Sequence, residues 1–100
     1  MYDLKNLAQL EKLGELAPEA FHGFVAFDEA TFKEGAIPLK YKELMAVAVA
    51  LTTQCPYCIA IHADKARKAD ASEKELAETT MVAAALRAGG AITHGTHTLE

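Results

Sequence analysis

The chain has 100 residues, of which 51% are hydrophobic and 24% charged, and its net charge is −4. The acidic balance excludes the basic surface that nucleic-acid binding needs, and the longest apolar run, residues 44–51, is too short to cross a bilayer. A chain of this length makes one domain, so we expect a single domain over residues 1–100. The first residues lack the basic and apolar regions of a signal peptide, which predicts a cytoplasmic protein.

Two helices are expected in the first third of the chain. Leucines recur every three or four residues over residues 3–16, where Asp3 is a suitable N-cap and Pro18 limits the far end. A second helix is expected over residues 18–33, because Pro18 fits the first helical turn and phenylalanines follow at mostly helical intervals. Gly35 and Pro38 then indicate a break.

The third helix is expected over residues 39–53. It becomes apolar on every side at residues 45–51, which is typical of a buried helix. The alternative is a strand over residues 47–53, because this stretch contains β-branched residues. The interleaved alanines, and the absence of a second strand candidate in the sequence, favour the helix.

The remaining sequence predicts two more helices. Residues 56–68 form the fourth, after a break before Pro56. The fifth begins at Ser72, because Glu75 three residues later completes a capping-box pattern. It is expected to run to about Ala88, where two glycines end or kink it, with a short extra turn over residues 91–97. The sequence therefore predicts an all-α, single compact domain of about five helices.

Both cysteines of the chain lie in Cys55-Pro56-Tyr57-Cys58, at the start of the fourth expected helix. If Pro56 takes the first helical position, Cys55 is the N-cap and Cys58 lies in the first turn. The positive end of the helix dipole lowers the pKa of a thiol at this place. His62 follows Cys58 by four residues and lies on the same helix face, where an imidazole can accept the thiol proton.

Glu43 is the candidate for orienting this imidazole. If the third and fourth helices pack antiparallel across the turn at Gln54, Glu43 meets the fourth helix just beyond His62. We then expect a direct or water-bridged contact between the two side chains. Taken alone, Glu43 also fits a solvated helix face.

Three interpretations of the cysteines remain open on the residues alone: a redox centre, a metal site and two inert thiols. Zinc would take Cys55, Cys58 and His62, with Glu43, His22 or His94 as a fourth ligand. A second Cys/His pair, usual in structural zinc sites, is missing from the sequence. His94 and His97 are typical of surface or interface residues. The alternatives to a peroxide-reducing enzyme are a metal-binding or non-catalytic oligomeric interaction module and a reductase of protein disulfides.

Glu43, eleven intervening residues and then Cys55-x-x-Cys58-x-x-x-His62 resemble the signature of a known family. It is the alkylhydroperoxidase D-like (AhpD-like) branch of the carboxymuconolactone decarboxylase superfamily. The resemblance spans residues 36–95 and includes the apolar helix before the cysteines and the alanine-rich helix after them. The decarboxylase branch lacks the cysteine pair, so this chain is similar to the redox branch.

The resemblance implies an all-helical subunit that forms trimers or hexamers. It implies an antioxidant role, in which the thiols reduce a small hydroperoxide or exchange with a partner, with an external dithiol or redox protein as reductant and no cofactor. Cys58 would be the peroxidatic cysteine, Cys55 would resolve its sulfenic acid, and His62 with Glu43 would form the proton relay. Tyr57 stands where the best-known member has a relay histidine. Helix-capping Cys-x-x-Cys pairs elsewhere favour the first cysteine as the attacker, whereas His62 favours Cys58, and we expect Cys58 to attack the peroxide.

Overall fold

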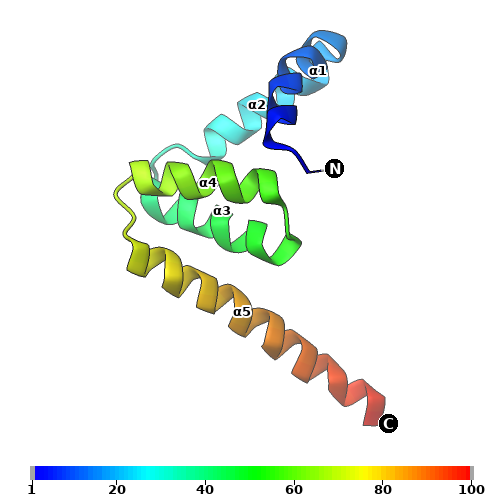
Figure 1. Cartoon of the computed structure of the whole chain (residues 1–100), viewed down its shortest axis with the longest axis vertical. Coiled ribbons are helices and arrows are strands. Elements are labelled where there is room, and N and C mark those ends of the chain that lie inside the picture. Colours follow the sequence, from blue (N-terminus) through cyan, green and yellow to red (C-terminus); the bar gives the residue numbers. More distant parts are fainter. Residues whose placement is uncertain (1, 100) are drawn as a thin grey trace. The chain divides into compact units, whose positions relative to one another are not determined.

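The computed structural model describes residues 2–99, and all regular structure in this range is helical (Figure 1). The expected all-α class with five α-helices is confirmed, and the described residues contain no strand. The chain divides into two compact units, one ending at Leu39 and the other beginning at Lys40. The single domain expected from chain length stays a prediction. None of the helices within residues 2–99 combines the length and the apolar character needed to cross a bilayer.

The N-terminal unit contains a 3-10 helix, η1 (Leu4–Gln9), followed by α1 (Leu10–Leu16) and α2 (Pro18–Thr31). Asp3 caps η1 as predicted, because its carboxylate accepts a hydrogen bond from the backbone N–H of Lys5 at 2.9 Å. The single helix predicted over residues 3–16 is wrong in its first half, which winds more tightly. Helix α2 begins at Pro18 as predicted and ends two residues earlier than expected.

The second unit is built on an antiparallel hairpin of α3 (Leu39–Thr53) and α4 (Pro56–Lys68), which lie side by side in Figure 1. Both helices have the predicted bounds, and the strand alternative over residues 47–53 is wrong. The turn between them has Gln54 in the left-handed region, at φ 55°. The backbone N–H of Cys55 then donates to the carbonyl of Ala50 at 3.1 Å, which satisfies one of the last carbonyls of α3. This turn reverses the chain directly before the cysteines.

Helix α5 (Glu73–Gly95) begins at the predicted capping box. The Ser72 hydroxyl accepts from the backbone N–H of Glu75 at 3.1 Å, and the Glu75 carboxylate accepts from the backbone N–H of Ser72 at 2.9 Å. The predicted end near Ala88 is wrong, because α5 continues through both glycines. Neither glycine has a positive φ. A glycine in right-handed conformation weakens a helix by roughly 0.5–1 kcal/mol relative to alanine but does not end it. A short 3-10 helix, η2 (Thr96–Leu99), follows.

The buried residues of the second unit form a stripe along α3. Leu44, Val47 and Ala50 are buried there, together with Ala66 of α4 and Ala83 of α5. Glu43 is the one charged residue buried among those described. Burial of α3 on every side, expected from its composition, is wrong, because Met45 and Val49 on another face are exposed. Helix α3 therefore aims a carboxylate into the interior and leaves part of its apolar surface uncovered.

Candidate functional site

The two cysteine sulfurs lie together at the start of α4. Cys55 has extended backbone, at φ −97° and ψ 100°, and caps the helix by accepting a hydrogen bond from the N–H of Cys58 on its Sγ at 3.3 Å. The two Sγ atoms are 2.8 Å apart and share a hydrogen bond. Both cysteines are free thiols, and Cys58 is the more exposed. The predicted N-cap position of Cys55 is therefore confirmed.

The pKa values of the two thiols are shifted in opposite directions. The side-chain hydrogen bond with Cys58, which stabilises an ionised Cys55 sulfur, is the largest cause that lowers the pKa of Cys55, and the backbone N–H of Cys58 lowers it further. The same bond raises the pKa of Cys58, because its proton is held by Cys55, and burial raises it as well. When the pair loses one proton, the negative charge therefore lies on Cys55. A lower pKa at the first cysteine agrees with helix-capping Cys-x-x-Cys pairs in general. It is opposite to the expectation from the position of His62, which favoured Cys58.

Glu43 and His62 meet across the α3–α4 hairpin. The Nδ1 atom of His62 is 2.6 Å from Oε1 of Glu43, and the side chains are only 17% and 4% exposed. The direct contact predicted from the sequence is present, and the alternative of a solvated Glu43 is wrong. Because Nδ1 faces the carboxylate, the pair fixes the orientation of the imidazole on α4. His62 and Cys58 lie one turn apart on the same helix.

The zinc set considered from the sequence is not assembled. Within residues 2–99, no three His, Cys, Asp or Glu side chains are grouped so as to hold a metal ion. His22 belongs to α2 in the N-terminal unit. His94 lies near the end of α5, where its Nδ1 is 2.9 Å from the carbonyl oxygen of Gly90. The four residues that the structure brings together are two thiols at one helix start and one acid–imidazole pair.

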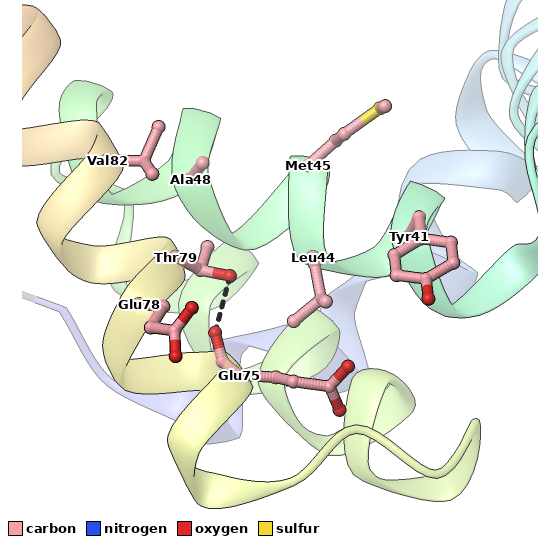
Figure 2. A pocket seen from close by; sticks show the side chains of 8 residues that line it. All are labelled: Tyr41, Leu44, Met45, Ala48, Glu75, Glu78, Thr79 and Val82. Atoms are coloured by element: carbon pink, nitrogen blue, oxygen red, sulfur yellow. Dashed lines mark hydrogen bonds between the residues drawn. The ribbon is translucent and has the colours of Figure 1, made fainter.

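Two cavities lie between α3 and α5 in the second unit, and neither was predicted from the sequence. The larger one, of about 400 Å³, is mainly apolar. Figure 2 shows its side chains from the two helices, with the Thr79 hydroxyl donating to the carbonyl of Glu75. The other, of about 340 Å³, lies near the end of α3 and includes Arg87 of α5. The guanidinium of Arg87 donates to the carbonyl of Thr52. A lone arginine in an alanine-rich helix carries no sequence signal for this placement.

Residues 18–100 of the chain match the carboxymuconolactone decarboxylase family. The chain belongs to this family. Solved structures agree with this family match. One is the apo form of a carboxymuconolactone decarboxylase family protein from Legionella pneumophila, which is 38% identical and superposes with a TM-score of 0.78. The superposition covers 82% of this chain and 73% of that one. A protein from Methanobacterium thermoautotrophicum superposes with a TM-score of 0.80 at 36% identity, covering 91% of this chain and 98% of that one.

Similar sequences come from several bacteria. Uncharacterized protein 4 in the cox locus of Paracoccus denitrificans is 42% identical over 76 residues, which are 76% of this chain and 68% of that protein. An uncharacterized protein from Cupriavidus necator is 32% identical over 74% of this chain and 66% of its own length. Another, from Haemophilus influenzae, is 40% identical over 55% of this chain and 49% of its own length. The aligned part of the chain thus spans about two thirds or less of these relatives.

Proposed function

We propose that the protein is a thiol-dependent hydroperoxidase or dithiol–disulfide oxidoreductase of the AhpD-like branch of its family. The observation that carries the proposal is the 2.8 Å separation of the Cys55 and Cys58 sulfurs at the start of α4. A pair of free thiols this close can close a disulfide with little movement of the backbone. The oriented His62–Glu43 pair, one helical turn beyond Cys58, supplies a group that can move protons.

The reaction begins with Cys58, because this residue is the more exposed of the two. Its proton passes along the hydrogen bond to Cys55, which generates the Cys58 thiolate. That thiolate attacks a peroxide oxygen, the O–O bond breaks, and the alkoxide leaves as an alcohol with the proton that Cys55 had first given to His62, returned through Nε2. Cys58 is then a sulfenic acid.

Cys55 completes the oxidative half of the cycle. Its sulfur bonds to the sulfenic sulfur, the S–O bond breaks, and hydroxide leaves as water with the Cys55 proton. The two thiols have been oxidised to a disulfide and the hydroperoxide reduced to an alcohol and water. An external dithiol or redox protein reduces the disulfide by thiol–disulfide exchange. The chemistry uses no cofactor, and its need for reduced thiols fits a reducing compartment, which we propose is the cytoplasm.

The test is consumption of an organic hydroperoxide in the presence of excess dithiothreitol. We expect the wild-type protein to be active, Cys58→Ser to lose turnover, and Cys55→Ser to stop after one turnover with a trappable sulfenic acid on Cys58. Equal activity of the wild type and Cys58→Ser would remove Cys58 as the nucleophile. A sulfenic acid trapped on Cys55 in Cys58→Ser, with none on Cys58 in Cys55→Ser, would reverse the two roles.

Two further measurements separate the alternatives. A protein disulfide that is reduced much faster than the hydroperoxide is consumed would favour the disulfide reductase. Stoichiometric zinc in protein purified without chelator, together with no turnover of either substrate, would favour the metal-binding or interaction module.

We also propose that the chain works as a homo-oligomer, a trimer or a hexamer. Helix α5 buries only Ala83 among its described residues, while its large apolar side chains are exposed: Met81, Val82, Leu86 and Ile92. A domain of 100 residues ordinarily buries about two thirds of its unfolded surface. A second copy that covers this face of α5 would add the apolar contacts that this helix lacks within its own chain.

A further inference from the structure

The smaller cavity of the second unit is positively charged. It has a volume of about 340 Å³ and is lined by Leu51, Thr52, Gln54, Thr80, Ala83, Ala84 and Arg87. Arg87 is the one ionisable side chain among these residues, in a chain whose net charge is −4. With no carboxylate in the lining to offset it, the guanidinium gives the cavity a local positive potential.

The hydrogen-bonding groups of the lining select an anion. The Thr52 hydroxyl donates to the Val49 carbonyl at 2.7 Å, and the Thr80 hydroxyl donates to the Leu76 carbonyl at 2.9 Å. Because these hydroxyl protons are used inside the helices, the side-chain donors left to a ligand come from Gln54 and Arg87. A guanidinium has five N–H donors, and the bond to the Thr52 carbonyl uses one nitrogen, NH1. Its planar fork matches a carboxylate.

This cavity adjoins the turn that carries the cysteines. Gln54 in its lining directly precedes Cys55, and the Thr52 carbonyl that Arg87 binds lies three residues before it. Three residues of chain span at most about 11 Å, and the turn is folded back by the bond from the Cys55 N–H to Ala50. Arg87 therefore lies beside the turn that leads into Cys55.

We propose that the cavity at Arg87 is a subsite for the carboxylate of the substrate, so that the thiol centre prefers hydroperoxides that carry a carboxylate. The inference rests on the proposed function and adds a substrate class to it. Arg87 and Gln54 bind the carboxylate while the peroxide end reaches the sulfurs at the start of α4. The apolar part of the lining accommodates the chain between the two ends.

The first test compares two alkylating agents that differ in charge. Iodoacetate carries a carboxylate and iodoacetamide does not, and both react with the reduced thiols of the full-length protein. We expect Arg87→Gln to lower the ratio of the iodoacetate rate to the iodoacetamide rate by about threefold to tenfold, because the guanidinium attracts the iodoacetate anion toward the thiols. Arg87→Lys should restore part of the ratio, and Lys74→Gln, thirteen residues earlier on α5, should leave it unchanged.

The ratio of the two alkylation rates distinguishes a role of Arg87 in binding from a purely structural role. If Arg87 only caps the end of α3 through Thr52, its loss alters both rates alike and the ratio stays constant, which would overturn the subsite. The second test uses a carboxylate-bearing hydroperoxide and its neutral methyl ester. Arg87→Gln should raise KM for the acid about tenfold, the effect of losing one hydrogen bond to a charged group, and leave KM for the ester unchanged. If neither compound is consumed, the proposed function fails, and the alkylation ratio still decides the subsite.

Discussion

His62 and Glu43 are joined by a contact of 2.6 Å between Nδ1 and Oε1, although 19 residues separate them in the chain. The contact ties α4 to α3 and holds a carboxylate in the interior of the hairpin. A buried charge without its partner is costly, so the pair has a structural role in addition to any catalytic one. Its two roles can be measured separately.

The structural role predicts strong coupling between the two side chains. In a double-mutant cycle of Glu43→Ala and His62→Ala, we expect a coupling energy of about 1–3 kcal/mol, because removing either residue leaves the other without its buried hydrogen-bonding partner. Urea unfolding of the two single variants and the double variant measures it. The exposed ion pair of Lys68 and Asp64 serves as the control and should show a coupling of no more than about 0.5 kcal/mol. Additive effects at Glu43 and His62 would contradict the pairing.

The hydrogen bond between the sulfurs predicts two separate thiol titrations. Absorbance of the thiolate near 240 nm should show one cysteine ionising below the ordinary thiol pKa and the other above it, since Cys55 is lowered and Cys58 raised. Cys58→Ala should raise the pKa of Cys55, because the donated S–H is lost. Cys55→Ala should lower the pKa of Cys58, because its proton is no longer held. Opposite signs in the two variants would reverse the donor and acceptor.

The glycines inside α5 predict a simple gain in stability. An added Cβ meets nothing within 4 Å at Gly89 or Gly90, and neither has a positive φ. Each change to alanine should therefore stabilise the helix by about 0.5–1 kcal/mol. Hydrogen exchange of the α5 amides and thermal unfolding measure the gain. Gly14→Ala is the contrasting control, because its Cβ would lie 2.8 Å from Cδ1 of Phe21 and should lower stability or shift that ring.

The exposed face of α5 predicts an oligomer that a single charge can weaken. Sedimentation should show wild-type protein larger than one chain, and Leu86→Glu should shift it toward the monomer, because a carboxylate would be buried in the contact. Lys65→Glu adds the same side chain at an exposed position of α4, outside this face, and should leave the assembly unchanged. A wild-type monomer at all concentrations would refute the proposed assembly.

The sequence alone determined the features that depend on neighbouring residues. The bounds of α3 and α4, the N-cap at Cys55 and the capping box at Ser72 all follow from residues within four positions of one another, and all are confirmed. The resemblance to the family rested on the longer spacing from Glu43 to His62, and the family match confirms the family. The helix end predicted from the local pattern at the two glycines of α5 was wrong. The low helix propensity of two glycines does not end a helix that the surrounding residues favour.

The tertiary structure decided what depends on distant residues or on the direction of a bond. Glu43 is buried because α4 packs over it, although its own helix would equally allow a solvated position. Arg87 reaches Thr52 across 35 residues, a relationship that no local spacing encodes. The order of the two thiol pKa values depends on the hydrogen bonds that the Cys55 sulfur makes at the start of α4, to the Cys58 backbone N–H and to the Cys58 sulfur. The spacing of residues in the sequence specifies which side chains share a helix face. Packing between helices specifies which side chains are buried and which hydrogen bonds they form.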